Sequence, residues 1–166
     1  MEKTFNINAT LTDTSRNNRK VRFYVTVDTV SNRIDIVQLK AGAIDEKKDS
    51  DAQMEKIFGE RPSYHMEVLS DLLVDLVDQL GGIEVKGKQV DGKKAFEMAD
   101  AGELDDVCDG VLRSLRKKNL LLTLPSLLSS LNANYRMDLS VGDLIKLVLS
   151  EVGELNDWKV SLKKMK

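Results

Sequence analysis

The sequence of 166 residues has only one cysteine, one histidine, two prolines and one tryptophan. A lone cysteine, Cys108, excludes an intrachain disulfide and the zinc sites that need several thiolates. His65 has no second histidine with which to share a metal ion, so it is a poor metal ligand candidate. No segment reaches the roughly 18–20 apolar residues that span a bilayer, and no signal peptide opens the chain. The sequence as given therefore predicts a soluble domain.

The overall composition is that of an ordinary globular protein, with 42% hydrophobic and 31% charged residues. A chain of this length forms one domain with one core, so residues 1–166 are expected to be a single domain. The formal net charge is −2. This value provides no broad positive field for nucleic acid and argues against DNA or RNA as the partner.

Alternating apolar and polar residues predict three strands near the N-terminus, at 5–11, 21–27 and 34–39. Short polar turns separate them, which favours antiparallel pairing. Two further segments, 64–68 and 158–162, have the composition of strands.

Helical spacing of apolar residues dominates the rest of the chain. Helices are expected over 51–58, over 69–80 with Ser70 as N-cap, and from Gly92 onward. Within this last part, the stripe over 104–118 has its acids first and its bases last, as the helix dipole favours. Two more helices are expected from Pro125 and over 140–152. The predicted fold class is α/β, mixed α+β, with a central mixed β-sheet flanked by helices.

The segment from Leu76 to Phe96 is the most distinctive part of the sequence. It contains LVDQLGGIEV and then VDGKKAF, a helix with a double-glycine exit, a short strand and a new helix. This order resembles the "LVDALGGVxV … LxGxxAL" stretch in the extracytoplasmic domain of the LytR–CpsA–Psr cell-envelope family. Residues 12–16 are similar to the family's "GTDSR" turn, and residues 137–147 to its "TNLSxxDLxxL" stretch. The resemblance implies a LytR–CpsA–Psr-like fold.

Active members of that family are phosphotransferases that move a glycopolymer from a polyprenyl-pyrophosphate carrier to peptidoglycan. The resemblance implies magnesium and several arginines at the pyrophosphate, whose charge needs a divalent cation and guanidinium groups. It also implies an extracytoplasmic location. A membrane anchor is expected to precede Met1 in the natural protein.

Most positions that carry this chemistry in the family hold other residues here. Lys20 falls near the metal-binding aspartate of the family's "RSDT", and Ala41 and Gly42 replace the arginine and aspartate of "SIPRD". The "YARxR" stretch is replaced by residues 98–102, and Asp109 replaces the first arginine of "DxxRxxRQ". We therefore expect no catalytic residues, no metal site and no cofactor, with magnesium required only if the family's activity is retained.

Five residues remain as candidates for ligand binding: Asp13, Arg16, Lys20, Lys40 and Arg113. Each has a structural alternative. The first two fit an ordinary polar turn, and the two lysines fit solvated strand ends. The arginine belongs to a basic cluster that the C-terminus of a helix attracts in any case.

Two other features have structural interpretations. Cys108 lies on an apolar helix stripe, where a buried thiol is expected rather than a nucleophile. Asp71, Asp75 and Asp78 are spaced four and three residues apart, which places them on the solvent side of the helix, opposite its leucines.

These observations favour a catalytically degenerate LytR–CpsA–Psr-like domain that binds or scaffolds during glycopolymer attachment. Its partner would be a polyprenyl-linked glycan, a wall polymer or another envelope protein, and it would be held at the membrane by the preceding anchor. An active magnesium-dependent phosphotransferase with a relocated site is the first alternative. A transcriptional attenuator is the second, and the net negative charge argues against it.

Overall fold

The computed structural model describes residues 4–15, 17–117, 131–138 and 159–165. A six-stranded sheet has the order β7-β4-β1-β2-β3-β8. Its N-terminal strands are β1 (Thr4–Asp13), β2 (Arg19–Asp28) and β3 (Arg33–Gln38), which pair antiparallel through short turns. The alternation in the sequence correctly predicted these three strands.

The chain then crosses one face of the sheet before the next strand forms. Helix α1 (Ser50–Phe58) lies on this connection, and β4 (Tyr64–Leu69) pairs parallel to β1. A parallel pair needs such a crossover, whereas an antiparallel pair needs only a turn. The remaining strands, β7 (Tyr135–Met137) and β8 (Lys159–Lys164), pair with β4 and β3 and form the two edges. The sheet is therefore mixed, as the sequence predicted.

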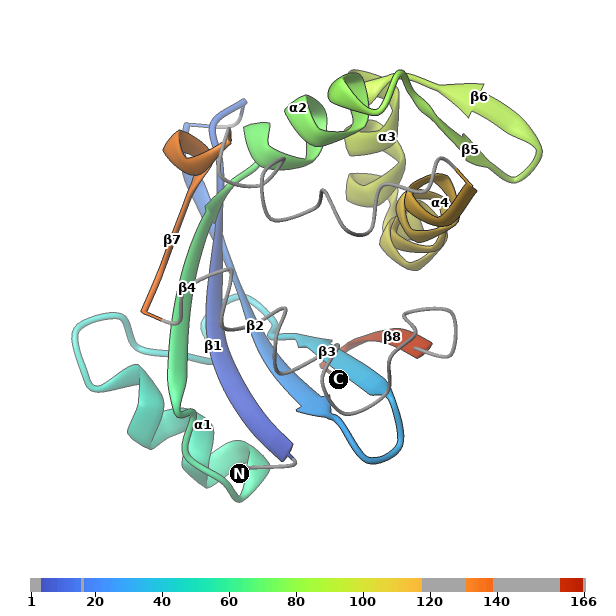
Figure 1. The fold of residues 1–166 in the computed structure, drawn as a ribbon. Coiled ribbons are helices and arrows are strands. Elements are labelled where there is room, and N and C mark those ends of the chain that lie inside the picture. The colour runs from blue at the N-terminus through green and yellow to red at the C-terminus, as the bar shows by residue number, and fades with distance from the viewer. Residues whose placement is uncertain (1–3, 16, 118–130, 139–158, 166) are drawn as a thin grey trace.

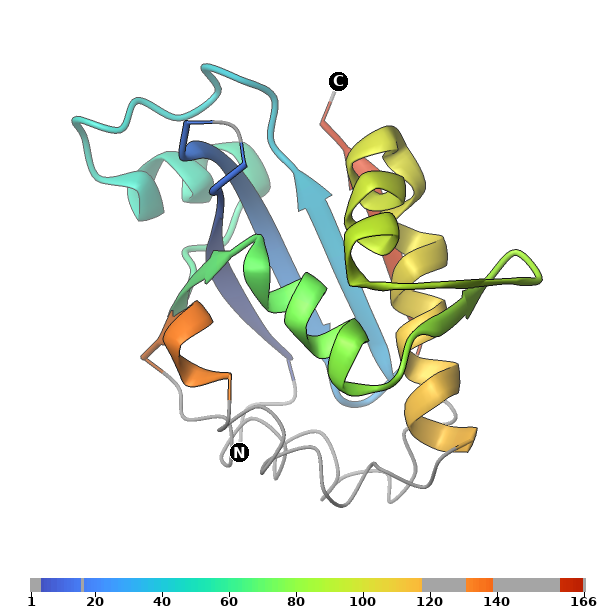
Figure 2. The ribbon, with the colours of Figure 1, turned by 90° about the horizontal axis from the view of Figure 1, so that it is seen from above.

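The other helices form a layer on the opposite face of the sheet from α1 (Figures 1 and 2). They are α2 (Asp71–Gln79), α3 (Gly92–Met98) and α4 (Leu104–Lys117), with a five-residue π-helical segment, Ala99–Glu103, between the last two. Gly102 has a φ of 97° within that segment, which separates α3 from α4. The helices expected from Pro125 and over 140–152 fall outside the described residues.

A short hairpin of β5 (Ile83–Val85) and β6 (Lys88–Val90) projects from the helical layer (Figure 1). The sequence predicted β5 but not β6, whose three residues include one apolar side chain. The double-glycine exit before it is confirmed, because α2 ends at Gln79 and both Gly81 and Gly82 have positive φ.

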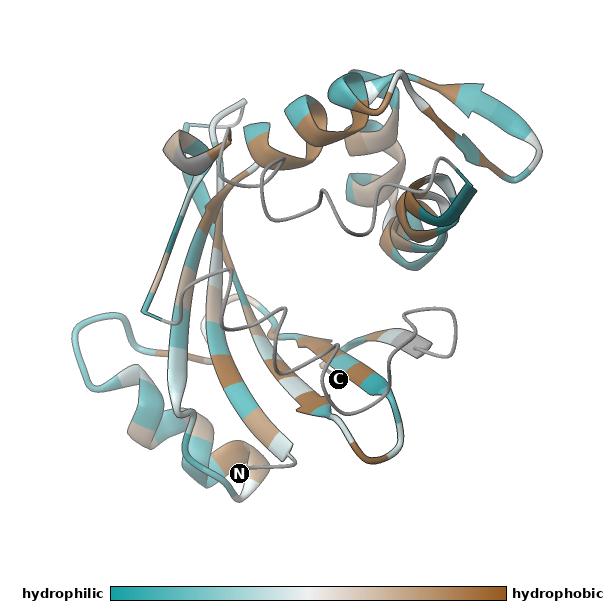
Figure 3. Ribbon diagram, viewed as in Figure 1, coloured by the Kyte–Doolittle hydropathy of each residue, from teal (hydrophilic) through white to brown (hydrophobic). Residues whose placement is uncertain are grey.

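The buried apolar residues form separate clusters in the sheet, beside α1 and among the helices. Figure 3 shows hydrophobic and hydrophilic residues alternating along the central strands. Phe5, Ile7 and Val27 lie at the centre of the cluster on the sheet face toward α2–α4. The cluster among α2, α3, α4 and β5 includes Val77 and Val107, both fully buried. The sheet and the helical layer thus each have a buried apolar cluster of their own.

Candidate functional site

The candidate site begins where β1 and β4 end. These strands run parallel, so the residues that follow both of them meet at the same end of the sheet. Asp13, the last residue of β1, is only 2% exposed. Its Oδ1 atom accepts hydrogen bonds from the backbone amide of Ser15 at 3.0 Å and from its hydroxyl at 2.6 Å. The carboxylate therefore holds its own turn, as an Asx turn does.

The turn after β1 is joined to the start of α2 by three hydroxyl and carboxylate contacts. The backbone amide of Thr14 donates to Ser70 Oγ at 3.1 Å, and the two hydroxyls are also 3.1 Å apart. The Thr14 hydroxyl donates to Asp71 Oδ1 at 3.0 Å. Ser70 was expected to cap the helix, but its side chain makes no capping hydrogen bond. The hydroxyl bonds to the β1 turn because the parallel pairing brings Thr14 against it.

The next pair connects the β1–β2 hairpin to the helical layer. Arg19 opens β2 opposite Asp13, and its guanidinium lies 3.6 Å from the Asp100 carboxylate in the π-helical segment. The arginine is half exposed, so the energetic contribution of the pair is small. The pair nevertheless places the Asp100 carboxylate, rather than a phosphate-binding arginine, beside this end of the sheet.

The structure brings some of the predicted ligand-binding candidates to this end of the sheet. Lys20 lies opposite Thr12 at the start of β2, and Lys40 follows the end of β3. Both lysines are exposed. Lys20 contributes to the lowered pKa of Glu46, although a hydrogen bond from Arg22 is the larger cause. Arg16 falls outside the described residues.

Arg113 is directed elsewhere. Its guanidinium donates to the backbone carbonyl of Glu84 in β5 at 3.1 Å. Gly110, one turn earlier on α4, packs so closely on β5 that an added Cβ would lie 2.8 Å from the same carbonyl. Arg113 also lies about 14 Å along the helix from Leu104, at ~1.5 Å per residue. The structure therefore places this candidate on the hairpin side of α4 rather than beside Asp13.

The residues at this end of the sheet do not fit the magnesium site that the fold would imply. Mg²⁺ prefers several oxygen ligands in octahedral geometry. Asp13 Oδ1 is already occupied by two Ser15 donors, and the nearby side chains of Arg19 and Lys20 are cationic. Within the described ranges, no three or more His, Cys, Asp or Glu side chains come together as a metal site would require.

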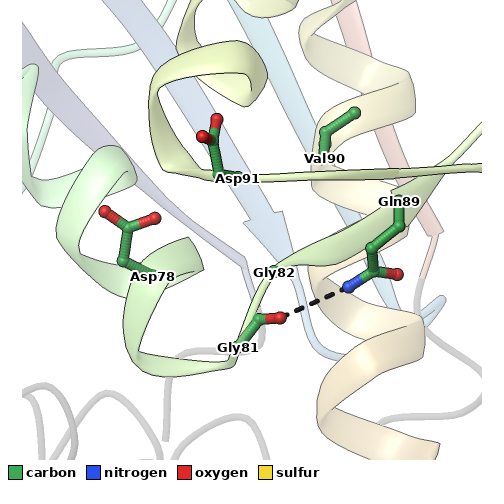
Figure 4. Close-up of a pocket in the computed structure, with 6 residues that line it drawn as sticks. All are labelled: Asp78, Gly81, Gly82, Gln89, Val90 and Asp91. Carbon is green, nitrogen blue, oxygen red and sulfur yellow. Dashed lines mark hydrogen bonds between the residues drawn. The ribbon is translucent and has the colours of Figure 1, made fainter.

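An open pocket lies at the helix exit and is built from structural contacts (Figure 4). Asp78 accepts the backbone amide of Gly92 at 2.8 Å, and Asp91 accepts that of Lys94 at 2.8 Å. Gln89 donates to the Gly81 carbonyl at 3.3 Å. Each carboxylate thus positions α3, and their charge would repel a phosphate. The lining residues are Asp78, Gly81, Gly82, Gln89, Val90 and Asp91.

The aspartates expected on the solvent side of α2 all accept hydrogen bonds from other parts of the chain. Asp71 contacts Thr14 and Asp78 contacts Gly92, as described above. Asp75 accepts the Asn134 side-chain amide at 2.8 Å. The carboxylates therefore connect α2 to its neighbours, a role that helical periodicity does not predict.

Cys108 has the environment of a structural thiol. Burial, together with the smaller effect of the Asp109 and Asp105 carboxylates, raises its pKa to about 11. A high pKa disfavours the thiolate, which is the nucleophilic form. The local electrostatics thus agree with the sequence interpretation.

Comparisons with known proteins identify the fold. No family model matches the chain, and no curated protein matches it. Among solved structures, TagV from Bacillus subtilis is 13% identical, with a TM-score of 0.61 over 98% of this chain and 85% of that chain. TagT bound to LI-WTA is 13% identical, with a TM-score of 0.65 over 99% of this chain and 78% of that chain.

A transcriptional regulator from Enterococcus faecalis is similar to the same extent. It is 16% identical, with a TM-score of 0.67 over 98% of this chain and 75% of that chain. At these identities the likeness establishes the fold alone. The chain has a LytR–CpsA–Psr-like fold, with a six-stranded mixed sheet flanked by helices.

Proposed function

We propose that this chain is a noncatalytic cell-envelope module that holds a polyprenyl-phosphate-linked glycan or wall polymer. The proposed location is extracytoplasmic. The TagT structure bound to LI-WTA supports the choice of a wall-teichoic-acid type of ligand for this fold. No helix of the described residues is long and apolar enough to cross a membrane.

The charged residues at the Asp13 end of the sheet support the noncatalytic part of the proposal. Arg19 is engaged by Asp100, and Lys20 stands where the resemblance places a metal-binding carboxylate. Pyrophosphate transfer requires cations directed at the oxygens that gain charge in the transition state. Here the Arg113 guanidinium is bonded to the Glu84 carbonyl instead. The same end of the sheet has positive charge from Lys20 and Lys40, which can attract a phosphate without metal-dependent phosphoryl transfer.

The lipid part of the proposed ligand rests on the resemblance to the LytR–CpsA–Psr family. The apolar side chains on the sheet are already packed: Phe5, Ile7 and Val27 are 2–3% exposed, and Phe5 lies edge-to-face on Tyr64, with ring centroids 5.5 Å apart. A polyprenyl chain gains hydrophobic contact with them only if this packing opens first.

Native mass spectrometry tests this proposal directly. The protein is purified from a membrane-containing bacterial lysate and also titrated with undecaprenyl phosphate, with phosphatidic acid as a control that shares the phosphate headgroup. A mass shift with the polyprenyl phosphate alone supports the proposal. Equal uptake of both lipids, or uptake of neither, contradicts it.

Two further assays distinguish the alternatives. Magnesium-dependent transfer of a glycopolymer from its carrier would replace the noncatalytic proposal with an active phosphotransferase. Duplex DNA binding that weakens steeply with salt would favour a transcriptional attenuator. We expect neither result.

A further inference from the structure

The only histidine of the chain lies between two carboxylates. On β4, the His65 ring places Nε2 at 2.6 Å from an Asp51 carboxylate oxygen and Nδ1 at 2.7 Å from an Asp138 carboxylate oxygen. Asp51 belongs to α1, and Asp138 follows β7. One side chain thus connects three elements that are separated along the sequence by 14 and 73 residues.

This geometry requires a doubly protonated ring. An ionised carboxylate only accepts hydrogen bonds, and a neutral imidazole has a single N–H. Both contacts therefore form only when His65 is an imidazolium. Accordingly, the pKa of His65 is raised, first by the hydrogen bond to Asp138 and then by that to Asp51, while partial burial opposes the shift.

We propose that His65 is a pH-operated latch that fastens the β7 edge of the sheet. With the ring protonated, Asp138 is held against β4. Loss of one proton leaves a ring lone pair facing a carboxylate, so one of the two contacts must break. The latch operates whether or not a carrier lipid is bound, and it does not depend on the proposed ligand.

The surroundings decide which contact yields. Asp51 has other partners, because its Oδ1 atom accepts the Asn8 amide at 2.9 Å and its Oδ2 atom lies 4.0 Å from Arg61. Arg61 is itself paired with Asp49 at 3.1 Å. The hydrogen bond to Asp49 raises the pKa of Arg61, and the charges of Asp51 and Glu55 act in the same direction. These groups hold α1 in place when the histidine is neutral.

Asp138 is held to β4 by His65. Its carboxylate accepts the His65 backbone amide at 2.8 Å and the ring at 2.7 Å, and its own amide donates to the His65 carbonyl at 3.2 Å. The adjoining strand β7 has only three residues paired with β4. Partial burial raises the pKa of Asp138, but the hydrogen bonds from His65 outweigh it, and the net shift is downward. The ring contact to Asp138 is therefore the one that breaks, and the Asp138 end of β7 is then held only by the two hydrogen bonds to the His65 backbone, so it opens more often.

The direction of the pH effect follows from the raised pKa. A histidine whose pKa is higher in the folded state contributes stability that is complete below the unfolded value near 6.5. This stability is lost as the pH rises through the folded pKa. For each unit by which the His65 pKa in the closed state exceeds that in the open state, where the ring keeps only Asp51, the closed-to-open ratio falls by about a factor of ten.

Nuclear magnetic resonance tests the latch in the intact chain, because a single histidine gives one ring signal. We expect a His65 pKa above 6.5 that falls in Asp138→Asn and in Asp51→Asn. Asp106→Asn, which alters the distant Lys86 pair, is the matched control and leaves the value unchanged. A wild-type pKa at or below 6.5 overturns the proposal.

Amide hydrogen exchange provides the second measurement, since a raised pKa alone does not show that the edge opens. After correction for the intrinsic rate, protection of the Asp138 amide should fall as the pH rises through the His65 titration. In His65→Gln, which cannot titrate, protection should be low and independent of pH. Constant protection in the wild-type protein across the titration overturns the latch, and this result does not require any variant to fold.

Discussion

Gly92 begins α3 directly against the backbone of α2. A Cβ atom at this position would lie 2.2 Å from the Val74 carbonyl oxygen and 2.9 Å from the Asp78 carboxylate. The Gly92 amide also donates to that carboxylate at 2.8 Å. The contact fixes the exit from α2 relative to the start of α3, which is the most distinctive feature of the sequence.

We expect Gly92→Ala to lower the free energy of unfolding by about 2–4 kcal/mol, because backbone atoms cannot move aside as a flexible side chain can. Urea denaturation measures the change. Gly87→Ala is the matched control, since it has a φ of 79° but open space around it, and should cost about 1 kcal/mol. Equal losses in the two variants would show that the close contact with α2 adds nothing to the cost of a side chain at position 92.

Arg22 joins the loop before α1 to a buried asparagine of β1. Its guanidinium makes two contacts to Glu46, at 2.8 and 2.6 Å, and donates to Asn8 Oδ1 at 2.7 Å. Asn8 is 3% exposed, so Arg22→Ala should destabilise the protein by about 1–3 kcal/mol through an unsatisfied amide oxygen. Arg33→Ala breaks an exposed pair and should change stability by less than about 0.5 kcal/mol. Chemical denaturation that gives similar losses for both variants would contradict this assignment.

The hydrogen bond between Ser161 and Asp35 connects β8 to β3 at 2.6 Å and is the main cause of the lowered pKa of Asp35. A lowered carboxylate pKa contributes stability above the unfolded value near 3.8 and loses it as the pH falls through the folded value. We therefore expect Ser161→Ala to raise the Asp35 pKa and to destabilise the protein at pH 7 but much less at pH 3. In an Asp35→Asn background this pH dependence should disappear. Carbon-detected titration and denaturation at the two pH values measure the effects.

The Cys108 thiol should react slowly. With a pKa of about 11, only about one thiol in a thousand is ionised at pH 8. We expect its reaction with Ellman's reagent to accelerate at least about a hundredfold when urea unfolds the chain, since both burial and the raised pKa are then removed. A native rate close to the unfolded rate would mean that the thiol is accessible and ionised.

Local patterns predicted the fold where apolar and polar residues alternate, as they do over 5–11 and 21–27 in β1 and β2. The alternation did not predict that both faces of β1 are covered, since Asn6 and Asn8 are only 2–3% exposed. The edge strand β7 was not predicted, because three residues carry too little periodicity and its pairing with β4 is nonlocal. Ser70 holds the N-cap position of α2 as predicted, but its hydroxyl does not cap the helix because it contacts Thr14, which is 56 residues away.

The candidate site was predictable to the same limited extent. The antiparallel pairing of β1 with β2 brings Asp13 and Lys20 to one end of the sheet. The direction of Arg113 depends on how Gly110 packs against β5, which sequence spacing does not encode. The two carboxylates beside His65 likewise come together only through the pairing of β4 with β1 and β7.

The position of β8 at the edge beside β3 has a consequence for synthesis. The Ser161–Asp35 contact joins residues 126 positions apart, so the β3 edge stays unpaired until β8 has also left the ribosome. An open strand edge can pair with another chain, and contacts of such long range form late. The sheet is therefore exposed to misassembly throughout translation, and nascent chains stalled before β8 should be the species that chaperones retain.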